Sequence, residues 1–214
     1  MRLAIFDLDG TLVDSAPDLH AALDRLMNAR GLPGFARPEV TAMIGDGARA
    51  LVTKALAARG RDFDEAALDA FLHDYEAHTT DHSAPFPGIE AALDRLATQG
   101  WRLAVCTNKP GLATARMLEA LGLAGRFPVV VGGDALPVRK PDPGHVRGVL
   151  AACGATPGEA VMIGDHRNDV LAAQGAGVAS VFCEWGYGQG VGATARCATP
   201  ADLPDLLAGM LGAA

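Results

Sequence analysis

The second half of the chain alternates short apolar runs with helical stretches, and this alternation restricts the fold more than any other feature. The expected strands are Arg102–Thr107, Val129–Val131, Ala160–Ile163 and Val178–Phe182. The expected helices are Ile89–Gln99, Leu112–Leu121, a helix that starts after Pro143, and a helix near Asp169–Gly175. Strands that alternate with helices form a parallel sheet with helices on both faces. The chain is therefore expected to have an α/β fold.

A block without strand signals separates this half from the first apolar run, Leu3–Phe6. Ser15, with Asp18 three residues later, resembles a capping box and predicts the start of a helix that ends near Gly31. Three more helical stretches follow: Glu39–Ile44, Gly47–Arg59 and Asp64–Thr80. We therefore expect an all-helical cap domain at residues 16–82, inserted into a Rossmann-like core domain made of residues 1–15 and 83–214.

Acidic residues follow two of the predicted strands. Asp7 and Asp9 come directly after the first apolar run, and carboxylates two residues apart at a strand end point to the same side. Open α/β sheets bind ligands in the crevice at that edge. Two such carboxylates repel each other unless a cation joins them, and Mg²⁺ prefers oxygen ligands. Asp165 would complete this oxygen cage, and Asp169 would orient a metal-bound water or pair with Lys140.

Two further polar segments suit phosphate oxygens. The hydroxyl of Thr107 and the backbone N–H groups that follow it, at Asn108 and beyond, lie at the end of a predicted strand. Lys140 is stiffened by the prolines Pro141 and Pro143 and would deliver a point charge. Considered one at a time, Thr107 and Asn108 are better explained as a polar turn, and Lys140 as a solvated surface lysine, than as phosphate-binding residues.

Charge and composition narrow the choice of partners. The net charge of −7 and the pI near 5.3 exclude the basic footprint typical of a nucleic-acid-binding protein. No apolar run reaches the ~18 residues of a membrane span, and no secretory signal is expected. The four cysteines lack metal-binding spacing and fit reduced thiols, which predicts a cytoplasmic protein. Composition leaves monomer and homodimer both open.

Four motifs, in this order, resemble those of the haloacid dehalogenase superfamily of phosphatases. They are DLDGTL at Asp7–Leu12, TNK at Thr107–Lys109, KPDP at Lys140–Pro143 and GDHRND at Gly164–Asp169. Within the superfamily, the chain most resembles the bacterial phosphoglycolate phosphatases. That closer likeness rests on the segments Met43–Arg49, Asn168–Ala173 and Trp185–Gly188. His166 stands where a serine is more usual.

The resemblance implies Mg²⁺-dependent hydrolysis of a small phosphate monoester, most closely 2-phosphoglycolate. It implies that Asp7 attacks phosphorus and forms an aspartyl-phosphate, while Asp9 protonates the leaving alkoxide and later accepts a proton from water. It also implies that Mg²⁺ is held by Asp7, Asp165 and Asp9, the last through its backbone carbonyl. The residues expected at the phosphoryl oxygens are Lys140, Thr107 and Asn108.

Other functions remain as alternatives. A phosphatase for another small phosphate and a phosphomutase would use the same pair of aspartates. A dehalogenase would not need a carboxylate at Asp9, and a non-catalytic phosphate sensor would lose some of the acids that this chain has.

Two features of the cap are less specific. Arg49 follows a glycine-containing turn, where its guanidinium is a candidate to bind a substrate carboxylate through two hydrogen bonds; a solvated arginine on a helix surface is the slightly favoured interpretation. His73, His78 and His82 lie in an acidic stretch, and His78 and His82 have a spacing that can bind a transition metal. A solvated helix end is the favoured interpretation of the three histidines.

Overall fold

The computed structural model describes residues 2–210, and within them six strands form one sheet in the order β5-β4-β1-β6-β7-β8. Every neighbouring pair in this sheet is parallel. The strands are β1 (Arg2–Phe6), β4 (Trp101–Cys106), β5 (Val129–Val131), β6 (Ala160–Gly164), β7 (Ala179–Cys183) and β8 (Ala195–Cys197). β1 lies in the interior between β4 and β6, so residues that follow it are flanked by two other strand ends.

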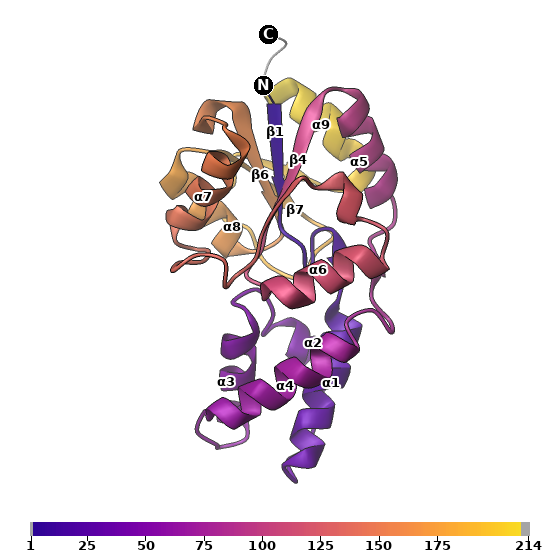
Figure 1. Ribbon diagram of the computed structural model, residues 1–214, viewed down its shortest axis with the longest axis vertical. Coiled ribbons are helices and arrows are strands. Elements are labelled where there is room, and N and C mark those ends of the chain that lie inside the picture. Colours follow the sequence, from indigo (N-terminus) through magenta and orange to yellow (C-terminus); the bar gives the residue numbers. More distant parts are fainter. Residues whose placement is uncertain (1, 211–214) are drawn as a thin grey trace.

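Helices cover both faces of the sheet, as the alternating sequence predicts (Figure 1). These helices are α5 (Ile89–Thr98), α6 (Gly111–Ala120), α7 (Pro143–Cys153), α8 (Arg167–Ala176) and α9 (Leu203–Met210), with short 3₁₀ turns at Ala124–Arg126, Pro157–Glu159 and Pro200–Asp202. One hydrophobic cluster packs α7 and α8 against one face. A second packs α5, α6 and α9 against the other. Burial on both faces explains why the central strands are continuously apolar.

Helices α1 (Ala16–Ala29), α2 (Arg37–Thr41), α3 (Ala48–Ala58) and α4 (Glu65–Ala77) form what we call the helical segment. It lies beyond the carboxyl ends of the strands, next to α6 (Figure 1). Its apolar side chains form a hydrophobic cluster distinct from the two that cover the sheet. In α1, Leu19, Leu23, Leu26 and Met27 supply the predicted buried stripe.

Two short connections join the helical segment to the sheet. Within the described residues, β2 (Val13–Asp14) and β3 (Ala84–Pro85) pair as an antiparallel ribbon. Next to this ribbon, the buried carboxylate of Asp18 accepts hydrogen bonds from the backbone N–H of His82 and from both the N–H and the hydroxyl of Ser83. The predicted capping box of Ser15 and Asp18 is therefore wrong: Ser15 makes no side-chain cap bond, and Asp18 ties the two connections together.

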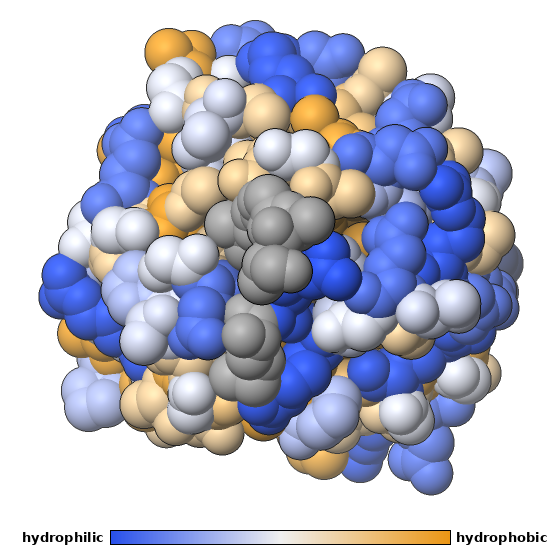
Figure 2. All heavy atoms as spheres, turned by 90° about the horizontal axis from the view of Figure 1, so that it is seen from above, coloured by the Kyte–Doolittle hydropathy of each residue, from blue (hydrophilic) through white to orange (hydrophobic). Residues whose placement is uncertain are grey.

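The predicted elements agree with the structure to within a few residues, and Val129–Val131 coincides with β5. The sequence patterns missed the ribbon, β8 and α9. The two ribbon strands have only two residues each, too few to show a periodic pattern. In the described residues, no helix is long and apolar enough to cross a membrane. The face at the amino ends of the strands mixes hydrophilic and hydrophobic residues, the latter scattered (Figure 2). The polar residues singled out above lie at the opposite edge.

Candidate active site

The carboxyl ends of three adjacent strands bring the predicted residues together. Asp7 follows β1, Thr107 follows β4, and Asp165 follows β6. All three residues are buried, each at most 6% exposed. Since β1 pairs with both of the other strands, its end is the centre of the site. The sheet edge therefore carries buried charge where an α/β fold binds its ligand.

One cluster of carboxylates could hold a metal ion. A carboxylate oxygen of each of Asp7, Asp165 and Asp169 lies within 4.8 Å of the other two. All three residues are buried, and buried carboxylates at this spacing are unfavourable unless cations compensate them. Oxygen ligands of this kind suit a hard divalent cation. The donor set thus fits Mg²⁺.

Asp165 shows the electrostatic cost of this cluster. Burial, and then the nearby charge of Asp7, raise the pKa of Asp165 to about 7. Its oxygens are oriented by the Thr11 hydroxyl at 3.0 Å and by the backbone N–H of Tyr187 at 2.8 Å. Gly10, which has a φ of +82°, leaves room for this carboxylate, because a Cβ there would collide with its Oδ2. These contacts hold the Asp165 carboxylate in position although its burial away from water is unfavourable.

Lys140 is the cation that the structure supplies to the cluster. It is 2% exposed, and its Nζ donates to Asp169 Oδ1 at 2.6 Å and to the Cys106 carbonyl at 2.6 Å. The same Nζ lies 3.0 Å from Asp7 Oδ1. Burial opposes the charge of the amine, but Asp169 and Asp7 outweigh it and raise the pKa of Lys140. The expected pairing of Asp169 with Lys140 is present.

His145, which sequence analysis missed, supports Lys140 from behind. Its Nδ1 accepts a hydrogen bond from the Lys140 backbone N–H at 3.2 Å, and its Nε2 lies 3.1 Å from the Gly132 carbonyl. Burial, and then the charge of Lys140, lower the pKa of His145. A neutral imidazole with its proton on Nε2 satisfies both contacts. This role could not be predicted from the sequence, because a histidine five residues after a lysine matches no known motif.

The segment after β4 presents a hydroxyl and an amide. The Thr107 hydroxyl accepts from the Lys109 backbone N–H at 3.2 Å, which leaves its own proton free to donate. The Asn108 side chain donates instead to the carbonyls of Gly45 at 3.0 Å and Lys140 at 2.8 Å. Both N–H groups of its amide are therefore engaged, whereas its Oδ1, which cannot donate, has no partner among the described residues. A hydrogen bond from Asn108 to phosphate therefore has to come from its backbone N–H.

Asp9 lies outside the carboxylate cluster. Its two oxygens accept from Lys109 Nζ at 3.0 and 3.3 Å. The same amine donates to the hydroxyl of Tyr75 at 2.5 Å. Any metal contact of Asp9 is thus left to its backbone carbonyl. Sequence analysis assigned no role to Lys109 or Tyr75; the position of Lys109 directly after the Thr107-Asn108 pair was the available signal.

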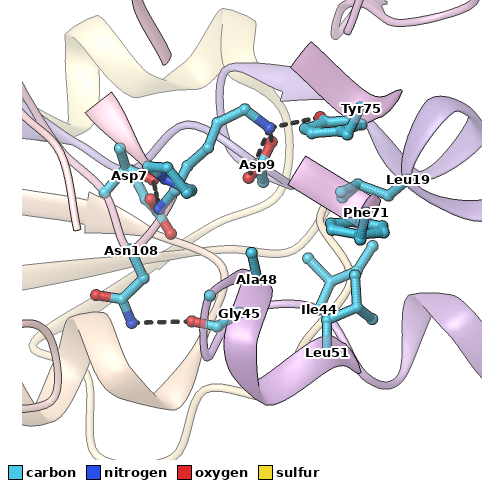
Figure 3. Close-up of a pocket in the computed structure, with 14 residues that line it drawn as sticks. Asp7, Asp9, Leu19, Ile44, Gly45, Ala48, Leu51, Phe71, Tyr75 and Asn108 are labelled. Atoms are coloured by element: carbon cyan, nitrogen blue, oxygen red, sulfur yellow. Dashed lines mark hydrogen bonds and ion pairs between the residues drawn. The ribbon is translucent and has the colours of Figure 1, made fainter. Parts of the chain in front are cut away.

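A pocket lies between the sheet edge and the helical segment (Figure 3). Asp7, Asp9 and the turn after β4 line one side. The side chains that line the other side come from the helical segment: Leu19, Ile44, Ala48, Leu51, Phe71 and Tyr75. The cavity measures about 40 Å³, room for roughly three water molecules when ~10–15 Å³ holds one. The pocket is therefore narrow between its two walls.

A glycine turn holds the helical segment against the sheet edge. Asn168 donates to the Asp46 carboxylate at 2.7 Å and to the Gly45 carbonyl at 3.3 Å. Gly47 has a φ of +88°, and a Cβ there would lie 2.9 Å from the Asn108 carbonyl oxygen. This close approach requires glycine, since a side chain would push the turn away from the site.

Arg49 is not brought to the pocket, which corrects the expectation that it binds a substrate carboxylate. Its guanidinium pairs with Glu65 at 2.6 and 2.9 Å and stacks over Phe63. About half of its side chain is exposed. As the second residue of α3, it projects away from the pocket, whereas Gly47 and Ala48 line it. The pairing with Glu65, far apart in sequence, was invisible to sequence analysis.

The histidines of the acidic stretch stay apart from the site. His78 pairs with Asp81 at 2.8 Å, and the backbone N–H of His82 bonds to Asp18. Within residues 2–210, the aspartates of the sheet edge are the side chains that gather as a possible metal site, and no histidine group does so. The transition-metal site that their spacing allowed is therefore absent from the described residues.

Comparison with known proteins gives consistent matches. A family model described as "Haloacid dehalogenase-like hydrolase" matches residues 4–183. A phosphoglycolate phosphatase of Cereibacter sphaeroides is 42% identical over 86% of this chain and 85% of its own length. One of Caulobacter vibrioides is 44% identical over 85% and 78%. A crystal structure of a predicted phosphoglycolate phosphatase from Haemophilus somnus superposes with a TM-score of 0.89, with 30% identity over 96% of this chain and 97% of that chain.

Proposed function

The chain belongs to the haloacid dehalogenase-like hydrolases and is a phosphoric monoester hydrolase, and from that premise we propose that it hydrolyses 2-phosphoglycolate to glycolate and phosphate. One observation carries the chemistry: the buried Asp7 carboxylate lines a small pocket, beside the amine of Lys140 and two further carboxylates. The curated relatives named phosphoglycolate phosphatase, at about 40% identity, support the choice of substrate.

We propose Asp7 as the nucleophile, through its Oδ2 atom. The backbone N–H of Leu8 and the amine of Lys140 both contact Oδ1, and no described residue donates a hydrogen bond to Oδ2. Attack of Oδ2 on phosphorus forms an aspartyl-phosphate and breaks the ester P–O bond, whose electron pair leaves with the alkoxide. Water then attacks phosphorus, the bond to Asp7 breaks, and free phosphate leaves.

We propose that Asp9 transfers the proton in both steps. It would donate a proton to the leaving alkoxide and accept one from the attacking water. Asp9 lines the same pocket as Asp7 and lies outside the metal-binding cluster, which supports this role. Its carboxylate is ion-paired with Lys109 Nζ, and that contact would have to weaken when Asp9 takes up the proton. The Thr107 hydroxyl, the Asn108 backbone N–H and Lys140 would bind the phosphoryl oxygens. Positioning and charge compensation of this kind dominate the catalysis of phosphoryl transfer.

We further propose that Mg²⁺ is held by Asp7, Asp165 and the backbone carbonyl of Asp9, with Asp169 supporting the site through Lys140. When bound, the cation would compensate the carboxylates and the charge on the phosphoryl group. The donor set and the raised pKa of Asp165 support this assignment.

The helical segment, residues 16–82 with its connections, is proposed to act as a cap on a core of residues 1–15 and 83–214. Its side chains form one wall of the pocket, and its glycine turn bonds to Asn108 and Asn168 of the core. Exclusion of water from the site is the expected consequence. The four buried free thiols support a reducing compartment such as the cytoplasm.

A panel of phosphate monoesters assayed with Mg²⁺ tests the proposal. We expect 2-phosphoglycolate to give the highest kcat/KM, with stoichiometric release of free phosphate. Transfer of the phosphoryl group to a sugar without phosphate release would identify a phosphomutase. A much higher kcat/KM on another ester would replace the proposed substrate.

A further inference from the structure

Lys109 is a buried cation that the proposed chemistry does not use. Its side chain is 2% exposed, although a lysine is rarely buried unless it is paired. It follows Asn108 at the end of β4, and its Nζ contacts the Asp9 carboxylate and the Tyr75 hydroxyl. In Figure 3, dashed lines run from Asp9 and from Tyr75 to one nitrogen atom between them, which is the amine of Lys109. Among the residues that the structure describes, Lys109 is the one cationic side chain that lines this pocket.

Tyr75 adds a second donor at the same place. It belongs to α4, and its ring stacks on Phe71 at a centroid distance of 5.7 Å, which fixes its orientation. Burial, and then the charge of Asp9, raise the pKa of Tyr75 well above its ordinary value, so the phenol keeps its proton. Its oxygen accepts from Lys109, and the hydroxyl proton therefore remains free to donate to an anion.

The chemistry of 2-phosphoglycolate fixes where its carboxylate has to lie. One methylene group separates the carboxyl carbon from the ester oxygen that receives the proton. A side chain that binds this carboxylate must therefore adjoin the residue that protonates the ester oxygen. Lys109 meets this requirement, since its Nζ lies 3.0 Å from the carboxylate of Asp9.

We propose that Lys109, assisted by Tyr75, binds the carboxylate of the substrate and determines the preference for a carboxylated phosphate ester. This inference rests on the proposed function and deepens it. Charge-assisted hydrogen bonds from the amine and one from the phenol would hold the carboxylate. The apolar wall of Ile44, Leu51 and Phe71 leaves larger or more polar groups without hydrogen-bond partners. The other candidate, Arg49, is engaged by Glu65 outside the pocket.

The test compares 2-phosphoglycolate with the smaller ester ethyl phosphate, in which a methyl group replaces the carboxylate. In Lys109→Met, kcat/KM for 2-phosphoglycolate should fall about 10- to 100-fold more than kcat/KM for ethyl phosphate, the range expected for a hydrogen bond to a charged group. Most of this difference should come from a rise in KM for 2-phosphoglycolate, with a smaller change in kcat. Tyr75→Phe should give a smaller loss of the same kind. Arg49→Met is the control and should leave both esters unchanged.

Inhibition by glycolate provides a readout of binding without turnover. Its inhibition constant should rise about tenfold or more in Lys109→Met. Lys109→Arg keeps the cation and should retain the preference for the carboxylated ester. If Lys109→Met does not fold, as judged by circular dichroism, Tyr75→Phe and Lys109→Arg decide the question by the same ratio of the two esters.

The possible failures are distinguishable. Equal losses on both esters would mean that Lys109 acts only by positioning Asp9, and an unchanged glycolate inhibition constant would exclude it as the carboxylate-binding residue. Either result overturns this inference and leaves the proposed function intact. If the unmutated enzyme hydrolyses ethyl phosphate as well as 2-phosphoglycolate, the proposed substrate itself is wrong, and the inference falls with it.

Discussion

The amine of Lys140 lies 3.0 Å from the Asp7 carboxylate at the bottom of the pocket, and both side chains are buried. Asp169 contacts the same amine at 2.6 Å. The lysine thus bonds both to a supporting carboxylate and to the proposed nucleophile. We propose that this one buried cation orients Asp7 and binds the phosphoryl group.

Removal of Lys140 should therefore damage both stability and activity. Lys140→Met leaves the Asp7 and Asp169 carboxylates buried without their cation, a change that typically lowers the free energy of unfolding by about 3–5 kcal/mol. In Lys140→Met/Asp169→Asn, one of these charges is gone, so part of the stability should return while activity stays lost. Urea unfolding and kcat measure the two effects. If the double variant lost as much stability as Lys140→Met and Asp169→Asn lose together, the interaction between Lys140 and Asp169 would contribute nothing to stability.

Asp9→Asn should affect substrates according to their leaving groups. A poor leaving group such as glycolate needs a proton, a contribution of roughly 10²–10⁴-fold, whereas nitrophenolate does not. Single-turnover measurements of the first step should show the larger loss with 2-phosphoglycolate. Equal losses with 2-phosphoglycolate and nitrophenyl phosphate would argue that Asp9 does not act as the acid.

Metal binding should depend on pH through Asp165, whose pKa is raised to about 7 in the folded, metal-free protein. The unfolded chain has the ordinary aspartate pKa of about 3.9. Between these values the folded state holds a proton that the unfolded state has lost, so the free energy of unfolding without metal should fall as pH rises. A bound cation requires the ionised carboxylate, so Mg²⁺ affinity should rise toward pH ~7 and then level off.

Thermal unfolding with EDTA and with Mg²⁺, across this pH range, measures that linkage. The stabilisation by Mg²⁺ should grow with pH and disappear in Asp165→Asn. Stabilisation by Mg²⁺ that is independent of pH would contradict the assignment of Asp165 as a ligand.

The glycine turn of the helical segment provides a test of its contact with the core. In Gly47→Ala, the new Cβ meets the Asn108 carbonyl oxygen at 2.9 Å, and the positive φ adds strain. Gly60 has a φ of +67°, and a Cβ there would meet nothing within 4 Å, so Gly60→Ala measures the strain of a positive φ without a collision. Gly60→Ala should lose about 1 kcal/mol of stability. Gly47→Ala should lose more, because Gly47 combines its positive φ with a ψ of 170°, a region essentially restricted to glycine, and the collision adds to this strain. Only Gly47→Ala should lower kcat/KM, by about tenfold or more; matching kinetics in the two variants would show that this contact is unimportant.

Much of the fold was predictable because it follows from local patterns of apolar residues in the sequence. The central strands are buried on both faces, which makes β1 and β6 continuously apolar and easy to identify. The same logic placed Asp7 and Asp165 at one sheet edge before the strand order was known. The capping box at Ser15 failed for the opposite reason: Asp18 bonds to Ser83, 65 residues away, and no local pattern reveals such a partner.

The parts of the site that escaped prediction depend on tertiary contacts. The proposed role of Lys109 depends on its contacts with Asp9 and with Tyr75 of α4. Only the packing of the helical segment against the sheet edge brings these three residues together. Arg49 lost its predicted role because Glu65 lies beside it in the folded chain. Residue type and position at a strand end therefore predict the reacting groups, whereas the residues that surround the substrate require the three-dimensional structure.

Rapid acid quenching during turnover of ³²P-labelled 2-phosphoglycolate detects the proposed aspartyl-phosphate itself. Protein-bound ³²P should form at early times, map to Asp7 and decay as free phosphate appears. It should be absent in Asp7→Asn, which should also lose at least ~10³-fold in kcat while remaining folded. Turnover of 2-phosphoglycolate with no label on the protein at any quench time, or with the label on another residue, would contradict the proposed aspartyl-phosphate.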